Sequence, residues 1–167
     1  NKYIEGFNPE ILNSAKATEK LDGTNVRVTV RNHIVVRIEK RRNPDKIQKH
    51  KGIEEPWYKD IDEYSPDDKW IIDGAKNTDF FSIPDGEWSG ELVGLNIQGN
   101  PLALESNRIV FFTLGQAPEF ENVPTTFLEL KEWLKNQKSK YGNGMIEGIV
   151  WHCENGEMFK IKTKDFK

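Results

Sequence analysis

Residues 147–162 read EGIVWHCENGEMFKIK, and this stretch decides the fold. Two runs with β-branched and aromatic residues, 147–153 and 158–162, flank the dipeptide Asn155-Gly156. Asn-Gly between two such runs is the strongest short signal for a β-hairpin with a two-residue type I′ turn. The sequence therefore predicts an antiparallel hairpin across these residues.

The register of this hairpin predicts which side chains share a face of the sheet. With a two-residue loop, Trp151 lies opposite Lys160. In the same register Ile149 lies opposite Lys162. Cross-strand partners share a face and side chains alternate with period two, so Glu147 joins them. One carboxylate and two ammonium groups then converge on one surface. A site for a phosphate-bearing ligand requires such a set, and a surface strand can also carry it by chance.

Further strand signals lie earlier in the chain. Residues 25–30 alternate between valine and polar side chains, and a β-branched run follows at 34–38. The short stretch 31–33 between them predicts a second hairpin. We also expect strands at 90–97 and 108–114, because both runs are rich in β-branched and aromatic residues.

Helical signals are few. Residues 126–140 form the clearest helix, because their apolar side chains recur at helical spacing. Thr126 followed by Glu129 fits a capping box, and Gly142 is expected to end the helix. The polar segment 54–68 contains two prolines and is expected to be a loop with one short helix. The strand-rich pattern predicts a single α+β domain.

Composition limits the classes of protein to consider. A chain of 167 residues suffices for one domain of ordinary size. It holds no run of about 18 apolar residues, so we expect no membrane span. The first residues lack the pattern of a secretory signal. Cys153 is the only cysteine, which fits the cytoplasm or another reducing intracellular compartment.

Charge is distributed unevenly along the chain, although the net charge is only -3. Residues 27–51 hold nine Lys/Arg and two Asp/Glu, an excess of 9 - 2 = 7 positive charges. Residues 52–91 hold twelve acidic and three basic residues, an excess of 12 - 3 = 9 negative charges. The basic block can meet phosphates, and it can equally be a solvated charged face.

The motif with the clearest chemistry is EKLDGTN at residues 19–25. Lys20-Leu21-Asp22-Gly23 matches the Lys-x-Asp-Gly signature and resembles the covalent nucleotidyltransferases: ATP-dependent DNA ligases, RNA ligases and mRNA capping enzymes. Further stretches resemble the later motifs of these enzymes and follow in the family's order over nearly the whole chain. They are Arg41-Arg42-Asn43, Gly90-Glu91-Leu92-Val93-Gly94, Val110-Phe111-Phe112-Thr113, Glu147-Gly148-Ile149-Val150 and Lys160-Ile161-Lys162.

Within this superfamily the chain is most similar to RNA ligases of the second type, from phage and RNA editing. Those enzymes have Glu-Lys-x-x-Gly-Thr-Asn, with Asn25 here five residues after the lysine. Two departures exist: Asp22 is the DNA-ligase choice, and Thr113 replaces the family's usual Asp. An ATP-dependent DNA ligase core is therefore the alternative, followed by a GTP-using capping enzyme and a non-catalytic nucleotide or nucleic-acid binding module.

The resemblance implies that Lys20 attacks the α-phosphate of ATP, expels pyrophosphate and becomes lysyl-AMP. An ordinary lysine has a pKa of about 10.4, so under roughly one in a thousand is neutral at pH 7. Burial and neighbouring positive charge favour the neutral amine that the attack requires. Lys160 and Lys162 supply that charge and stabilise the α-phosphate in the transition state.

The resemblance also implies the other contacts of the nucleotide. Glu147 is the expected ligand of Mg²⁺ or Mn²⁺, because these ions prefer carboxylate and phosphate oxygens. Glu91 accepts a hydrogen bond from a ribose hydroxyl, and Phe112 (or Phe111) stacks on adenine. The remaining contacts are expected from Glu19, Asp22, Gly23, Asn25 and Arg42 (or Arg41).

The fold and partners that the resemblance implies complete the expectation. The fold is a ligase-type nucleotidyltransferase domain, with antiparallel sheets flanking a nucleotide cleft and helices on the surface. We expect it to occupy residues 1–167 without an OB or other C-terminal domain, as either a minimal ligase or a truncated catalytic core. The protein is expected to be a monomer that joins nucleic-acid ends bearing a 5′-phosphate and a 3′-hydroxyl, RNA being favoured over DNA.

Overall fold

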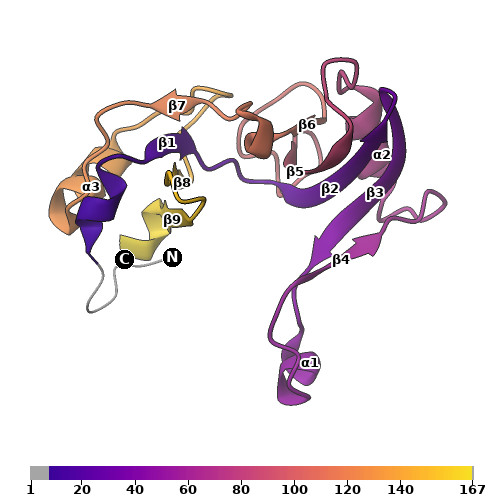
Figure 1. Cartoon of the computed structure of the whole chain (residues 1–167), viewed down its shortest axis with the longest axis horizontal. Coiled ribbons are helices and arrows are strands. Elements are labelled where there is room, and N and C mark those ends of the chain that lie inside the picture. The colour runs from indigo at the N-terminus through magenta and orange to yellow at the C-terminus, as the bar shows by residue number, and fades with distance from the viewer. Residues whose placement is uncertain (1–7, 167) are drawn as a thin grey trace. The chain divides into compact units, whose positions relative to one another are not determined.

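The computed structural model describes residues 8–166, and these divide into two compact units. The first unit contains residues up to 22, 101–103 and those from 117 onward, and the second contains 23–100 and 104–116. Each unit is built on its own antiparallel sheet with few helices, which confirms the predicted α+β class (Figure 1). The prediction of one functional domain stays a prediction. No helix in the described part of the chain is long and apolar enough to cross a membrane.

The first unit holds a four-stranded sheet with strand order β7-β1-β8-β9. Three helical segments accompany it, and α3 packs Leu130 and Leu134 into the core of this unit. The elements are η1 (Pro9–Leu12), β1 (Lys16–Glu19), β7 (Glu119–Phe120), α3 (Phe127–Lys135), β8 (Gly148–His152), β9 (Met158–Lys162) and η3 (Thr163–Phe166).

The predicted hairpin 147–162 is confirmed, but its register is shifted by one residue. Cys153 and Glu157 form the last hydrogen-bonded pair, so the loop has three residues rather than two. Gly156 has φ 87° and occupies the left-handed position that a three-residue hairpin loop needs. Ile149 consequently lies opposite Ile161.

This shift changes which side chains share a face. Ile149, Trp151 and Ile161 are buried in the core of the first unit, whereas Lys160 and Lys162 lie on the other face of β9. The prediction that the two lysines share a face with Ile149 and Trp151 was therefore wrong. A one-residue slip exchanges cross-strand partners, and the apolar set selects the register that buries it. The two lysines still share one face with each other.

The second unit holds a five-stranded sheet with strand order β4-β3-β2-β5-β6. One face of this sheet is covered by α2, whose Ile71 contributes to the buried cluster. The elements are β2 (Thr24–Arg31), β3 (Ile34–Arg42), α1 (Lys46–His50), β4 (Trp57–Asp60), α2 (Lys69–Lys76), β5 (Gly86–Val93), β6 (Arg108–Val110) and η2 (Phe112–Leu114).

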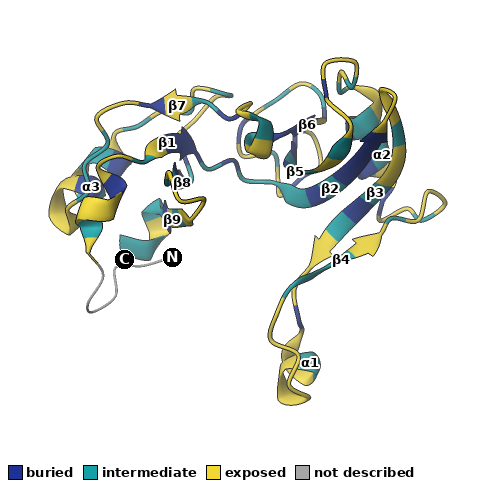
Figure 2. Ribbon diagram, in the orientation of Figure 1, coloured by how far each residue is buried: buried dark blue, intermediate teal, exposed yellow. Residues whose placement is uncertain are grey.

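The predicted hairpin of β2 and β3 is confirmed. Val26, Val28 and Val30 are fully buried, as their alternation with polar residues predicted. Asn32 and His33 both have positive φ, 52° and 63°, which is the backbone of a type I′ turn. Figure 2 shows much of β2 in the dark blue of buried residues.

Four elements differ from the predictions. A strand, β4, forms within 54–68 because it pairs with the end of β3, and such long-range pairing overrides a polar local composition. The helix expected at 126–140 ends at Lys135, well before Gly142. Its Thr126 hydroxyl contacts the Glu129 carboxylate rather than a backbone amide. The strand expected at 90–97 is β5, which begins and ends four residues earlier. The strand expected at 108–114 ends at Val110 as β6, and η2 follows it.

Candidate active site

The centre of the candidate site is an ion pair between Lys20 and Glu147, which are 127 residues apart in the chain. Lys20 Nζ donates to Glu147 Oε2 at 3.0 Å, and the two side chains are 18% and 17% exposed. Pairing of β1 with β8 explains the juxtaposition. The pairing continues one residue further, because the Lys20 amide donates to the Gly148 carbonyl at 2.9 Å. The sheet thus places the amine beside the carboxylate.

Lys162 approaches the same carboxylate from β9. Its Nζ lies 3.5 Å from Glu147 Oε1, so each carboxylate oxygen faces a different ammonium group. The backbone supports this arrangement, because the Thr163 amide donates to the Glu147 carbonyl at 2.9 Å. Lys160 lies exposed two residues earlier on the same face of β9. Of the four residues predicted to gather, Lys20, Glu147 and Lys162 are therefore in contact, and the part of Lys160 stays a prediction.

Asp22 belongs electrostatically to this cluster. Burial raises the pKa of its carboxyl above the ordinary value, and the negative charge of Glu147 raises it further. The positive charges of Lys20, Lys162 and Lys164 oppose the shift without cancelling it. Two carboxylates and several ammonium groups thus share one partly desolvated surface, an arrangement typical of sites that bind phosphates and metal ions.

Glu19 has a structural role beside the candidate nucleophile. Its carboxylate is 2% exposed and accepts hydrogen bonds from the Ser139 hydroxyl at 2.6 Å and the Lys140 amide at 2.7 Å. These bonds fasten the segment that follows α3 to the end of β1. The predicted role of Glu19 toward the nucleotide stays a prediction.

In the second unit, the polar face of the sheet holds Asn25 in a hydrogen-bonded network. Tyr58 Oη donates to Asn25 Oδ1 at 2.5 Å and lies 3.1 Å from Ser89 Oγ. Asn25 also lies directly opposite Glu91 in the pairing of β2 with β5. Sequence reasoning missed Tyr58, because β4 was expected to be loop. The available signal was the aromatic pair at 57–58.

A guanidinium group packs against Tyr58 from the neighbouring strand. The Arg27 guanidinium lies over the tyrosine ring, 4.3 Å from its centroid. It also makes a bidentate ion pair with Glu39, at 2.9 and 2.8 Å. Because Glu39 is only 2% exposed, this is a strong, geometrically defined pair. Tyr58 is therefore held from two sides.

The strand register separates Arg41 from Arg42. Arg41 lies opposite Tyr58, on the face that carries Asn25 and Glu91. Arg42 lies on the opposite face, where Asp68 has a lowered pKa. Burial of Asp68 opposes that shift, but hydrogen bonds from the Asp62 amide and Lys40 outweigh it, helped by the charges of Lys40 and Arg42. Of the two arginines left open by the sequence, Arg41 therefore shares a face with the other predicted site residues.

Packing also separates Phe111 from Phe112. Phe111 is fully buried in the core of the second unit, so it is not free to stack on a base. Phe112 begins η2 and is half-buried, so it remains the candidate for stacking on adenine. Gly23 satisfies its predicted steric requirement, because a β-carbon there would lie 2.0 Å from the Leu92 carbonyl oxygen.

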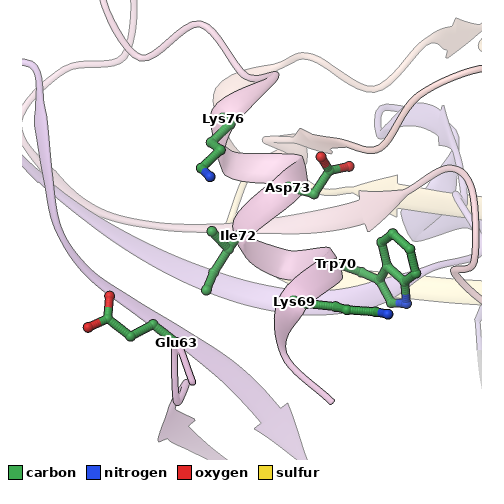
Figure 3. Close-up of a pocket in the computed structure, with 6 residues that line it drawn as sticks. All are labelled: Glu63, Lys69, Trp70, Ile72, Asp73 and Lys76. Atoms are coloured by element: carbon green, nitrogen blue, oxygen red, sulfur yellow. The ribbon is translucent and has the colours of Figure 1, made fainter. Parts of the chain in front are cut away.

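One surface hollow is lined by none of the predicted site residues. It is formed around α2 in the second unit, and its lining is largely charged (Figure 3). Lys69 there lies over the ring of Trp70, 4.5 Å from its centroid. The lining residues are Glu63, Lys69, Trp70, Ile72, Asp73 and Lys76.

Comparison with known protein families identifies one match. The family model described as RNA ligase 1 matches residues 76–166, which is more than half of the chain. RNA ligase 1 of Rattus norvegicus is 39% identical over 74 residues, which cover 42% of this chain and 22% of the rat protein. RNA ligase 1 of Danio rerio is 33% identical over 81 residues, with the same two coverages. The matched segment thus spans about a fifth of these relatives.

Comparison with solved structures identifies the fold. A Naegleria gruberi RNA ligase variant with AMP and Mn superposes with a TM-score of 0.59 at 15% identity, covering 95% of this chain and 52% of the other. The Naegleria gruberi RNA ligase with PPi superposes with a TM-score of 0.56 at 16% identity. The match covers 95% of this chain and 53% of the ligase. The chain therefore has the fold of about half of that ligase.

Proposed function

Because this chain belongs to the RNA ligase 1 family, we propose that it is the nucleotidyltransferase part of an ATP-dependent RNA ligase. The observation that carries the proposal is the cluster of Lys20, Glu147 and Lys162. An amine, a carboxylate and a second ammonium group meet within 3.5 Å there, in the order of motifs that the superfamily uses.

The reaction begins when the Lys20 amine, after losing a proton to solvent, attacks the α-phosphorus of ATP. A P–N bond forms, the P–O bond to the β-phosphate breaks, and pyrophosphate leaves. Lys162 and Lys160 lie on one face of β9 and stabilise the negative charge that gathers on the α-phosphate. The AMP then passes to a 5′-phosphate end of RNA, and a 3′-hydroxyl displaces it to join the strands.

The acidic residues of the first unit fit a divalent cation. Within residues 8–166 no group of three or more His, Cys, Asp or Glu side chains forms a ready-made metal cage. Mg²⁺ and Mn²⁺ sites that serve phosphoryl transfer need only one or two carboxylates, since phosphate and water complete the shell. Glu147 and Asp22 would hold such an ion. When bound, it would supply positive charge to the phosphates and occupy the carboxylate that otherwise holds the Lys20 ammonium.

Side chains of the second unit keep the roles that the resemblance implies. Glu91 is assigned to a ribose hydroxyl and Phe112 to the adenine ring. Asn25 and Arg41 are assigned to phosphate oxygens, with Arg41 now preferred to Arg42. Two points support Arg41: it shares a face of the sheet with Asn25 and Glu91, and an arginine guanidinium can donate two parallel hydrogen bonds to a phosphate.

The substrate is tested by a sealing assay. The protein is incubated with ATP, Mg²⁺ and nicked duplexes whose 3′-hydroxyl strand is RNA or DNA, and the products are separated by size. Joined strands, with adenylylated 5′ ends as an intermediate, are expected mainly for RNA. Faster sealing of the all-DNA nick would favour the DNA ligase alternative, which Asp22 supports. Covalent labelling by GTP in preference to ATP would favour a capping enzyme.

Tyr58 gives a further prediction. The variant Tyr58→Phe keeps the ring beneath Arg27 but removes the hydroxyl that orients Asn25. A hydrogen bond of this kind contributes about 1 kcal/mol, so the rate of lysyl-AMP formation should fall about five- to tenfold. Single-turnover labelling with ATP measures this rate. The exposed Tyr64 provides the matched control, and Tyr64→Phe should react as wild type. Equal rates for Tyr58→Phe and wild type would show that Tyr58 does not position Asn25.

A further inference from the structure

Within the basic block 27–51, which holds nine cations, two groups of three are paired differently in the structure. The first group is neutralised. Arg27 pairs with buried Glu39, and Arg37 pairs with Asp60 at 2.6 Å. Lys40 pairs with Asp68, which is 2% exposed. Each of these three cations thus has a carboxylate partner.

The second group lies where the chain leaves the sheet. Residues 43–56 connect β3 to β4 and project beyond the sheet, with α1 at the end (Figure 1). The sequence 46–51, KIQKHK, contains three lysines and one histidine but no acidic residue. We name it the cationic tip. Within the part of the chain that the structure describes, no carboxylate lies within 4 Å of Lys46, Lys49 or Lys51.

Local hydrogen bonds hold the backbone of the cationic tip. Asp45 and Gln48 form a reciprocal capping box at 2.8 and 2.9 Å. Gly52, with φ 86°, ends the turn, and the Ile53 amide donates a hydrogen bond to the Gln48 carbonyl. No residue of α1 is buried. The tip is therefore preorganised without contributing to a core, which indicates a contact surface rather than a stability element.

The side chains of the tip suit a polyanion with an apolar component. Lys46 and Lys49 are three positions apart, so they lie on the same side of the turn. Ile47 is 66% exposed among them. Figure 2 shows α1 almost entirely in the colour of exposed residues. The connection 43–56 also holds three acidic residues: Asp45 caps the start of α1, and Glu54 and Glu55 follow on the return limb outside the tip.

We propose that the cationic tip binds the phosphodiester backbone of the RNA that the ligase joins. This inference rests on the proposed function for the identity of the partner, because an RNA strand is the polyanion that the reaction requires. The lysines contact phosphates and release counterions, which gives affinity without sequence preference. The tip takes no part in the attack of Lys20 on ATP.

The test separates RNA binding from catalysis. Binding of a fluorescent 5′-phosphorylated single-stranded RNA is measured by anisotropy over a series of salt concentrations, without ATP. The variant with Lys46→Ala, Lys49→Ala and Lys51→Ala should bind at least about tenfold more weakly. The slope of log affinity against log salt should fall by about 2, since each phosphate contact on a single strand contributes about 0.7. Covalent labelling by ATP alone should equal wild type.

Two further variants make the result specific. Lys131→Ala, Lys135→Ala and Lys138→Ala remove the same charge from α3 and the residues just after it, and should bind RNA as wild type. Lys46→Arg, Lys49→Arg and Lys51→Arg keep the charge and should retain affinity. Wild-type RNA binding by the tip variant, or an equal loss in the α3 variant, would overturn the proposal. Because binding is measured without ATP, failure of wild type to form lysyl-AMP would refute the proposed function separately.

Discussion

Protein carrying Lys20→Arg is expected to form no covalent AMP adduct when incubated with labelled ATP and Mg²⁺. Arginine keeps a positive charge beside Glu147, so the ion pair of the resting site is retained. It does not lose its proton in proteins, so it offers no neutral nitrogen to attack the α-phosphate. The expected loss is at least about 10³-fold, down to the detection limit of the labelling assay.

The comparison with Lys20→Ala separates two roles of the lysine. Both variants should lack the label, but only Lys20→Ala also removes the positive charge beside Glu147. The label on wild type should survive denaturation and be released by acid, because a P–N bond hydrolyses in acid. Label on Lys20→Arg equal to that on wild type would show that another residue is the nucleophile.

The second large effect is expected for Glu147→Gln, with about a 10²-fold or greater loss in the rate of lysyl-AMP formation. The amide has the same size but no negative charge, so it holds neither ammonium group as an ion pair and binds a divalent cation poorly. The three-point arrangement of Lys20, Glu147 and Lys162 then loses its centre. Single-turnover labelling at saturating ATP measures the rate.

Two observations accompany the change at Glu147. Asp22 should titrate at a lower pH in the variant, because burial and then the charge of Glu147 are the two causes that raise its pKa, and the second is removed. Carbon-detected NMR of the carboxyl group follows this titration. Glu154→Gln, an exposed change in the loop of the same hairpin, is the control and should label normally. A Glu147→Gln rate within about twofold of wild type would exclude Glu147 from the reaction.

The fold was predictable where apolar residues recur at a spacing that places them all on one buried face. The alternation of Val26, Val28 and Val30 predicted β2 and its buried face correctly. The Asn-Gly signal predicted the last hairpin but not its register, because the three-residue loop depends on how Ile149 and Ile161 pack in the core. The strand β4 was missed because its partner, the end of β3, is supplied by tertiary pairing and not by its own composition.

The residues of the candidate site were likewise predictable only in part. Motif order identified Lys20, Glu147 and the two lysines 160 and 162, and the structure brings Lys20, Glu147 and Lys162 together. Choices within Arg41-Arg42 and Phe111-Phe112 needed the register and the burial that only the fold provides. Tyr58 was not predictable from motifs at all, because its role depends on two other strands that hold Asn25 and Ser89 beside it.

The central claim is that one amine of this chain accepts AMP. Wild-type protein is incubated with ATP and Mg²⁺, digested under conditions that preserve the P–N bond, and mapped by mass spectrometry. We expect the added mass of AMP on the peptide that contains Lys20 and on no other. AMP located on Lys160 or Lys162, or a protein that stays unmodified while still binding ATP, would contradict it.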